Sequence, residues 1–430
     1  MIDRPTSNKD STGISPDSTE DSAKNLQQGV ARCSALALVR PELLVREAYV
    51  PGLPEKRLIR LHANENPWSI EDIETSEDGL QRAVEKISQA GLSKTAATAS
   101  NASHYTAAES ENRELNRYPD PRPAELVAAM ASYYEVNEDY ILPVRGSDDG
   151  IDLLTRAFCS AGKDSILISS PTFGMYAAFA EIQGANIVDV PLLLRDNKFS
   201  FDLDKLAANS AQSKLVYICS PNNPSGNSLS RDQIVSLCEQ LDGRAIVVAD
   251  EAYIEFSAHQ SCANLIAQHD NLVVLRTLSK AFGAAGLRMG AVLAHPDLIR
   301  VLQSISTPYA LSTPVIELAL QGLQQQSLSA LQSRCQFLLE HRLQLAEALA
   351  THSLVNTVYD GDANFLLVKF NDSELVAKTL MDSGILVRNF SQAQGCENCL
   401  RITIGREEEN RKLLTVLDRI QGSATSEQLS

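Results

Sequence analysis

The run Leu272-Val273-Val274-Leu275-Arg276-Thr277-Leu278-Ser279-Lys280 is mostly apolar, and it breaks into the small-residue stretch 281–286 before Arg288. This pattern predicts a buried strand that ends near Lys280. An amine at the end of a strand, with hydroxyls before it and a guanidinium after it, can form a Schiff base beside a bound phosphate. A lysine in this position is more often a solvated surface residue, so other segments must separate the two interpretations.

A second buried strand is predicted at 245–250, where an unbroken apolar run ends in Asp250-Glu251-Ala252-Tyr253. Strands buried on both faces belong to parallel sheets, which place ligands at the carboxyl ends of their strands. A carboxylate there can keep a pyridinium nitrogen protonated, so that the ring accepts the electron pair left on a substrate's α-carbon. Asp250 together with Lys280 therefore indicates pyridoxal phosphate. The alternative for a single Asp is that it caps the following helix.

Two further segments supply groups for the same ligand. Residues 214–219 form a third apolar run and lead into Ser220-Pro221-Asn222-Asn223-Pro224-Ser225-Gly226, a turn whose prolines fix Asn223 at the sheet edge. Its amide can donate to the ring's 3-oxygen, although such turns are common on their own. Residues 144–154 combine a glycine turn with the start of an amphipathic helix, whose backbone N–H groups can hold a phosphate. The two acids at this helix start would repel a phosphate unless they point away.

In this order the segments resemble the histidinol-phosphate aminotransferase family, whose members are fold-type I pyridoxal phosphate enzymes. The resemblance runs from about residue 49 to residue 417. Besides the segments above, it rests on Asn64-Glu65-Asn66-Pro67, Leu115-Asn116-Arg117-Tyr118-Pro119, Pro171-Thr172-Phe173-Gly174-Met175-Tyr176, Asn364-Phe365 and Leu400-Arg401-Ile402-Thr403-Ile404-Gly405. The implied fold is α/β, with a mostly parallel seven-stranded sheet in a large domain and a smaller α+β C-terminal domain.

The resemblance implies a role for each candidate residue. Lys280 links to pyridoxal 5'-phosphate, Asp250 meets its pyridine nitrogen, and Asn223 and Tyr253 bind its 3-oxygen. Phe173 stacks on the ring, where many relatives have Tyr. The phosphate is expected among Ser147, Asp148, Thr277, Ser279 and Arg288, with Tyr118 reaching it from the partner subunit of a homodimer. Arg401 is expected to hold the carboxylate of glutamate, and Arg388, with Tyr49 and Asn64, the distal anion of the substrate.

The two arginines also have a physical argument of their own. Arg388 and Arg401 each adjoin a short β-rich run of the predicted small domain. A planar guanidinium binds a carboxylate or a phosphate through two hydrogen bonds. Without the cofactor segments, an ordinary surface ion pair would be the default interpretation for either residue.

The implied activity is amino transfer between histidinol phosphate and 2-oxoglutarate, which gives imidazole-acetol phosphate and glutamate in histidine biosynthesis. Lys280 would move the proton of the substrate's α-carbon. A threonine-phosphate decarboxylase or an aromatic amino acid aminotransferase of the same fold could use nearly the same residues. The reaction type depends on which α-carbon bond stands perpendicular to the ring, and this geometry cannot be read from a sequence.

Charge and composition restrict the partners. The chain has 430 residues, 44% of them hydrophobic, and a net charge of −16, which argues against nucleic acid or an anionic membrane as partner. No run reaches the roughly 20 apolar residues that span a bilayer. The eight scattered cysteines favour the reduced thiols of a cytoplasmic enzyme. Cys396 and Cys399 form one C-x-x-C without a second pair, so no metal is expected and a loop is the preferred interpretation.

Six parts are expected along the chain. Residues 1–30 form a disordered extension, 31–67 an N-terminal arm that packs on the small domain, 68–114 a flexible insertion, 115–325 the cofactor-binding large domain, 326–422 the small domain and 423–430 a disordered tail. The insertion is longer than the family has there, and both its flanks, Asn64 and Tyr118, are assigned to the site. It is therefore expected over the substrate entrance or the dimer seam, with a tolerated surface insertion as the alternative.

Overall fold

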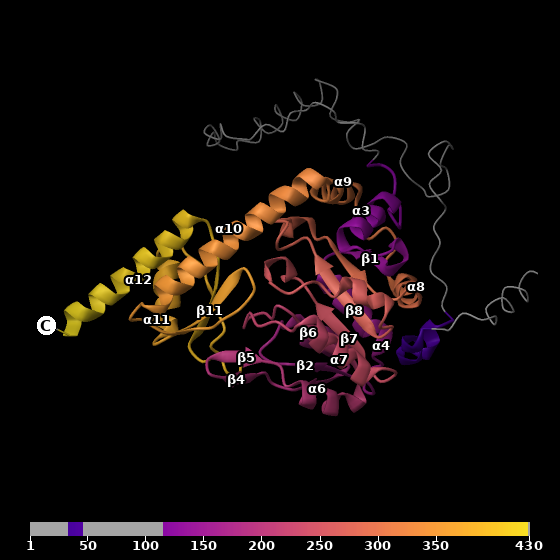
Figure 1. Cartoon of the computed structure of the whole chain (residues 1–430), viewed down its shortest axis with the longest axis horizontal. Helices are drawn as coiled ribbons and strands as arrows, with labels where there is room; N and C mark the ends of the chain where they lie inside the picture. The colour runs from indigo at the N-terminus through magenta and orange to yellow at the C-terminus, as the bar shows by residue number, and fades with distance from the viewer. Residues whose placement is uncertain (1–32, 46–114, 429–430) are drawn as a thin grey trace, which may run out of the picture. The chain divides into compact units, whose positions relative to one another are not determined.

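The computed structural model of the chain describes residues 33–45 and 115–428. Within this part the strands form a seven-stranded sheet, a four-stranded sheet and a two-stranded hairpin (Figure 1). The large sheet and its helices make up the large domain, and the four-stranded sheet lies in the C-terminal small domain. The hairpin consists of β4 (Leu193–Arg195) and β5 (Lys198–Ser200).

The large sheet has the strand order β1-β9-β8-β7-β6-β2-β3. Its strands are β1 (Ile141–Val144), β2 (Ser165–Ile168), β3 (Asn186–Asp189), β6 (Ser213–Cys219), β7 (Ile246–Asp250), β8 (Leu272–Thr277) and β9 (Gly290–Leu293). β9 runs antiparallel to β8 and β1, while β8, β7, β6, β2 and β3 are parallel to one another. The two apolar runs predicted as buried strands are the adjacent strands β7 and β8, in which every residue is buried. Their shared carboxyl edge brings Asp250 near the segment that follows Thr277.

Helices cover both faces of this sheet. On one face, α3 (Ala124–Tyr134), α6 (Leu203–Asn209) and α7 (Arg231–Leu241) share an apolar cluster that includes Val274 of β8. On the other face α4 (Ser147–Phe158) packs closely, because a Cβ added at Gly150 would lie only 3.0 Å from Leu275. Val274 and Leu275 are neighbours in the strand, and successive side chains point to opposite faces. The large domain is therefore a three-layer α/β structure.

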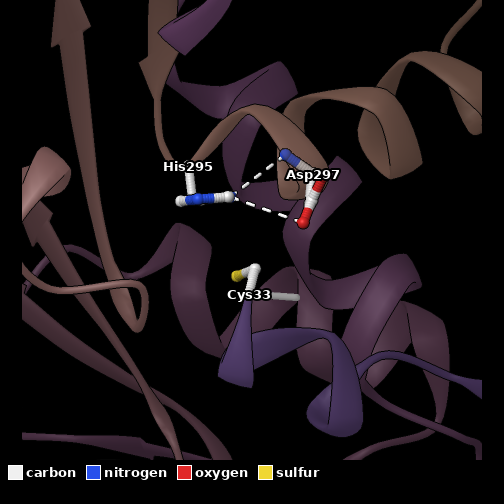
Figure 2. A group of neighbouring side chains, drawn as sticks. All are labelled: Cys33, His295 and Asp297. Carbon is white, nitrogen blue, oxygen red and sulfur yellow. Dashed lines mark hydrogen bonds and ion pairs between the residues drawn. The ribbon is translucent and has the colours of Figure 1, made fainter. Parts of the chain in front are cut away.

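The remaining elements of the large domain are short. They are α5 (Met175–Gln183), α8 (Pro296–Ile305), α9 (Thr313–Gly322), η4 (Glu138–Tyr140), η5 (Ser210–Gln212), η6 (Ile254–Phe256), η7 (Ala263–Ala267) and η8 (Ala285–Leu287). The start of α8 is capped by His295, whose Nδ1 accepts a hydrogen bond of 3.2 Å from the backbone N–H of Asp297 (Figure 2). The same Nδ1 atom lies 3.8 Å from an oxygen of the Asp297 carboxylate.

The small domain is an antiparallel sheet with helices. Its strands β10 (Val355–Val358), β11 (Phe365–Phe370), β13 (Cys399–Thr403) and β12 (Arg388–Asn389) are paired in this order. Its own apolar core is formed with α10 (Gln325–Ala350), α11 (Ser373–Asp382) and α12 (Glu407–Gln428). α10 contacts both α9 and the β10–β11 hairpin, so it joins the two domains (Figure 1). The expected α/β fold with a mostly parallel seven-stranded sheet and a smaller α+β domain is confirmed.

The structure describes only part of each chain end. The described part of the N-terminal arm, with η1 (Ser34–Leu38) and η2 (Pro41–Leu43), contacts the large domain at α8. It is held there because the backbone N–H of Arg40 donates to Ala157 O at the end of α4 and the Arg40 guanidinium donates to Arg156 O. The helix α12 extends to Gln428, into the segment 423–430 that the sequence predicts as a disordered tail. The insertion 68–114 and the rest of the arm lie outside the described residues.

Among the described residues, no helix is both long and apolar enough to cross a membrane.

Candidate active site

A cavity of about 500 Å³ opens at the carboxyl edge of the large sheet, against the small domain. Its walls come from the ends of β6, β7 and β8, the start of α4, the turn before α5, and β12 and β13 of the small domain. The residues that line it are Ser147, Asp148, Thr172, Phe173, Gly174, Met175, Cys219, Asn223, Asp250, Ala252, Tyr253, Thr277, Ser279, Lys280, Arg288, Arg388, Phe390 and Arg401. Most of the candidate site residues, which come from separate segments of the sequence, therefore line the same cavity.

Lys280 lies three residues beyond the end of β8 and faces the cavity. Partial burial lowers the pKa of its amine, and the positive charge of Arg401 lowers it further. The Nζ atom lies 5.4 Å from the centre of the Tyr253 ring. An amine with a lowered pKa is a neutral nucleophile and a proton acceptor for a larger fraction of the time at neutral pH.

Asp250 ends β7 and is 2% exposed. Burial raises the pKa of its carboxyl to about 6, although hydrogen bonds from Tyr176 and from the backbone of Ala252 oppose this rise. The Tyr176 hydroxyl donates to Oδ2 at 2.7 Å, and the N–H of Ala252 donates to Oδ1 at 3.2 Å. Asp250 does not begin a helix of the α type, and its carboxylate faces the cavity, so the capping alternative does not describe its position.

Asn223 is held by the rigid turn after β6. The side chain of the preceding Asn222 donates to Pro171 O at 2.8 Å and accepts from Thr172 Oγ1 at 2.8 Å, which ties this turn to the one before α5. Asn223 Oδ1 accepts a hydrogen bond from the Arg401 guanidinium. Because the oxygen of the amide is engaged in this way, the amide presents its N–H groups as donors to other partners.

The start of α4 and the residues after β8 form a polar cradle. Gly146 precedes α4 with a φ of 82°, and a Cβ at this position would lie 2.7 Å from the Arg288 guanidinium. Arg288 itself has a φ of 52° and donates to Ser279 Oγ at 3.1 Å, while Thr277 Oγ1 donates to Ser279 Oγ at 3.0 Å. Helix N–H groups, two hydroxyls and a guanidinium thus converge, which is the donor set that a phosphate requires.

The two acids at the start of α4 differ in their surroundings. Asp149 forms an ion pair of 2.8 Å with Arg145 and accepts a hydrogen bond from the Arg145 backbone N–H. Asp148 forms an ion pair of 3.3 Å with Arg288 and lines the cavity. Only Asp148 therefore stands against an anion in the cradle, and Arg288 compensates its charge.

Arg388 and Arg401 are directly opposite each other on the paired strands β12 and β13. Residues opposite each other on paired strands point to the same face, so the two guanidiniums line one wall of the cavity. Burial lowers the pKa of Arg401, and the charge of Arg388 lowers it as well. The Arg401 guanidinium also lies 5.1 Å and 5.4 Å from the ring centres of Phe365 and Phe390. Two like charges in this arrangement are suited to a ligand with two anionic groups.

One predicted residue lies outside this cavity, and two others are not among the residues that the structure describes. Tyr118 does not line it, is 51% exposed, and stacks on Tyr309 with ring centres 4.5 Å apart. Tyr49 and Asn64 lie outside the described residues. Cys396 and Cys399 lie in the loop and strand start between Arg388 and Arg401, where a loop was the preferred interpretation.

Sequence reasoning missed several residues around the cavity. Tyr176 was quoted only as part of a motif, although it contacts Asp250. Phe390 lines the cavity two residues after Arg388. Arg276 is buried behind the site, where it forms ion pairs of 2.6 Å with Glu255 and 3.6 Å with Glu251. The only signal for Arg276 in the sequence is a charged residue inside an apolar strand, which requires a buried partner.

Comparisons with known proteins agree with this geometry. The family model described as Aminotransferase class I and II matches residues 76–417. Histidinol-phosphate aminotransferase 1 of Pasteurella multocida is 43% identical over 74% of this chain and 91% of its own length. Histidinol-phosphate aminotransferase of Aeromonas hydrophila is 43% identical over 71% of this chain and 85% of its own length.

Solved structures share the fold. The histidinol-phosphate aminotransferase of Clostridium acetobutylicum has a TM-score of 0.66 at 22% identity, over 72% of this chain and 92% of that one. The L-threonine-O-3-phosphate decarboxylase of Porphyromonas gingivalis has a TM-score of 0.63 at 23% identity, over 72% and 91%. The fold alone therefore does not separate these two activities. The family match and the curated relatives do, and they confirm the resemblance found in the sequence: this chain belongs to the class I and II aminotransferases.

Proposed function

We propose that this aminotransferase exchanges an amino group between L-histidinol phosphate and 2-oxoglutarate, with pyridoxal 5'-phosphate as its cofactor. The observation that carries the proposal is one cavity in which Lys280 and Asp250 face a pair of opposed arginines, Arg388 and Arg401. The first pair suits the cofactor. The second suits glutamate, which has a carboxylate at each end, and also the single phosphate of histidinol phosphate. The names of the curated relatives support the same substrate.

The residues of the cavity fit this cofactor. A phosphate would occupy the cradle of Ser147, Thr277, Ser279 and Arg288, where the absence of a Cβ at Gly146 leaves room for the guanidinium. Asp250 would meet the ring nitrogen, and Asn223 and Tyr253 would donate to the 3-oxygen. Phe173 would lie against the ring, since stacking requires only an aromatic face. When bound, pyridoxal 5'-phosphate supplies a sink for the electron pair left when a bond to the substrate's α-carbon breaks.

Lys280 would act twice in this scheme. Its amine would hold the cofactor covalently and, once released by the amine of the substrate, would take the proton from the substrate's α-carbon at Nζ. Burial and the charge of Arg401 lower the pKa of this amine, so both roles are favoured near neutral pH. Asp250, as a buried carboxylate, would stabilise the positive charge of a protonated ring nitrogen.

The two arginines would select the substrate. Arg401, held by Asn223 and flanked by two aromatic rings, would bind the carboxylate of glutamate. Arg388 would bind the distal anion, which is the phosphate of histidinol phosphate in one half-reaction and the side-chain carboxylate of glutamate in the other. In both cases an incoming anion would relieve the repulsion between the guanidiniums.

Assembly and location remain part of the proposal. We infer a homodimer in which Tyr118 reaches the partner's cofactor phosphate, because Tyr118 is exposed and lies outside its own subunit's cavity. Tyr49 and Asn64 are proposed to join Arg388 at the distal anion. A cytoplasmic location remains a prediction from the scattered cysteines.

The test is a steady-state assay of glutamate formation from histidinol phosphate and 2-oxoglutarate. Lys280→Ala is expected to reduce turnover by at least about 10²- to 10⁴-fold, because it removes the group that moves the proton. Borohydride treatment should trap the cofactor on Lys280 in the native protein and not in this variant. Lys163→Ala, at an exposed lysine, is the matched control. Release of carbon dioxide from phosphothreonine without glutamate formation would instead assign the protein as a decarboxylase.

A further inference from the structure

We propose that Tyr176 is a positioning residue of the reaction, which keeps Asp250 a carboxylate and at the same time fixes the ring of Phe173. The inference rests on the proposed function, because Asp250 and Phe173 are the two residues that would meet the cofactor ring at its nitrogen and on its face. Tyr176 itself does not line the cavity. It would act only through these two neighbours.

The contacts of Tyr176 place it between both groups. Its hydroxyl donates to Asp250 Oδ2 at 2.7 Å. Its ring meets Phe173 edge to face, with ring centres 5.6 Å apart and an interplanar angle of 86°. Tyr176 is fully buried, so neither contact competes with water. One side chain thus links the acid at the end of β7 with the aromatic residue before α5.

The ring of Tyr176 is fixed by packing on its side away from the cavity. Its ring stacks on Tyr217 of β6 with ring centres 4.6 Å apart and an interplanar angle of 13°. Tyr217 in turn lies 3.2 Å from Thr155 Oγ1 of α4, and Thr155 donates to Ile151 O at 2.8 Å. Since α4 begins at the phosphate cradle, the same packed column connects the cradle with Asp250. The column leaves the Tyr176 hydroxyl little freedom to turn away.

The chemistry of this contact depends on a balance at Asp250. Burial, Asp148 and Glu251 all favour the neutral acid, while the hydrogen bonds of Tyr176 and Ala252 favour the carboxylate. Burial and the charge of Asp250 raise the pKa of Tyr176, so its phenol stays protonated and remains a donor. Across the cavity, the charge of Asp250 opposes the lowering of the Lys280 pKa. A ring nitrogen that meets Asp250 would share one proton with it, and loss of the Tyr176 donor would shift that proton from the nitrogen toward the carboxylate.

Tyr176→Phe removes the hydroxyl and keeps the ring, so the stack on Tyr217 and the edge contact with Phe173 are retained. Tyr217→Phe is the matched control. It removes the hydroxyl of a tyrosine that is also buried, and this hydroxyl does not contact Asp250. The first readout is the carboxyl ¹³C titration of Asp250 in both unliganded variants. The midpoint is expected to rise in Tyr176→Phe and to stay at the wild-type value in Tyr217→Phe. This measurement is independent of cofactor binding and of activity.

The second readout is the ¹⁵N chemical shift of the ring nitrogen in protein loaded with labelled pyridoxal phosphate. It should move toward the unprotonated position in Tyr176→Phe alone, and kcat should fall by about 10- to 100-fold. With an analogue whose ring nitrogen is replaced by carbon, the difference in kcat between wild type and Tyr176→Phe should disappear.

An unmoved Asp250 midpoint, or equal effects in both variants, would overturn the role of Tyr176. Failure of the wild-type protein to take up the cofactor would overturn the proposed function, and the ¹³C result would still decide whether Tyr176 holds Asp250 ionised.

Discussion

Asp250 is a residue at which stability and proposed function oppose each other. Burial raises the pKa of its carboxyl from 3.8 to about 6. Because the folded-state pKa lies above the unfolded value, the carboxyl destabilises the unliganded protein fully above pH 6, and this cost disappears as the pH falls toward 3.8. A shift of this size corresponds to about 3 kcal/mol. Asp250→Asn is therefore expected to increase the free energy of unfolding at pH 8 by about 2 to 3 kcal/mol, and to increase it less at pH 5.

Urea unfolding of the unliganded protein at both pH values measures this effect, and the amino transfer assay should show that the same variant is inactive. Asp149→Asn is the control, because that carboxylate is paired with Arg145 and should give no gain. An equal stability of wild type and Asp250→Asn at pH 8 would contradict the argument.

Single residues also show what a sequence can predict about a site. Lys280, Asp250 and Asn223 could be nominated because each follows a recognisable strand, and the carboxyl ends of parallel strands meet at one edge. Tyr176 could not, because its partner is 74 residues away in the chain and no local pattern encodes the contact. The family resemblance placed Asp148 and Arg288, 140 residues apart, at the same phosphate, but the sequence left open which of the two acids would point away.

Among the elements, the pairing of β12 with β13 has the most direct consequence for substrate selection. Its register sets Arg388 opposite Arg401, and Arg401 alone is held by Asn223. Arg388 is exposed in the unliganded protein, so Arg388→Ala is expected to raise KM for histidinol phosphate by about 10- to 150-fold, which corresponds to about 1.5 to 3 kcal/mol for hydrogen bonds between charged groups. The effect on kcat should be smaller, because Arg388 binds far from the reacting carbon.

Steady-state kinetics with histidinol phosphate and with glutamate measure this prediction. Arg406→Ala, at an exposed arginine just beyond β13, should leave both KM values unchanged. If Arg388→Ala and Arg406→Ala behaved alike, the ordinary surface interpretation of Arg388 would hold.

The success of element prediction depended on how strongly each element is buried. β7 and β8 were placed almost to the residue because a fully buried strand must be an unbroken apolar run. The start of α10 at Gln325 could not be predicted from the sequence, because the first turns of this helix are largely polar and exposed and carry little apolar periodicity. The position of the N-terminal arm depends on hydrogen bonds to the end of α4, about 116 residues away, and no sequence pattern reports such bonds.

At the scale of the whole molecule, the large and the small domain contact each other through backbone atoms of two glycines, close to the turn that carries the cavity residue Asn223. Gly226, in the turn that carries Asn223, touches Gly361 in the β10–β11 connection, and Asp362 N donates to Gly226 O at 2.8 Å. A Cβ at Gly361 would lie 2.8 Å from Gly226 Cα, a distance that real Cβ atoms do not tolerate against backbone.

Gly361→Ala must therefore move the small domain away from the turn and stretch the hydrogen bond between Arg401 and Asn223. We expect the free energy of unfolding to fall by about 1 to 3 kcal/mol, and kcat/KM for glutamate to fall about 10-fold or more because its carboxylate loses a preorganised Arg401. Gly322→Ala is the control, because a Cβ there meets only Phe282 at 3.9 Å. Kinetics and urea unfolding on both variants decide the matter: if Gly361→Ala were as active and as stable as Gly322→Ala, the contact of the two glycines would not set the geometry of the cavity.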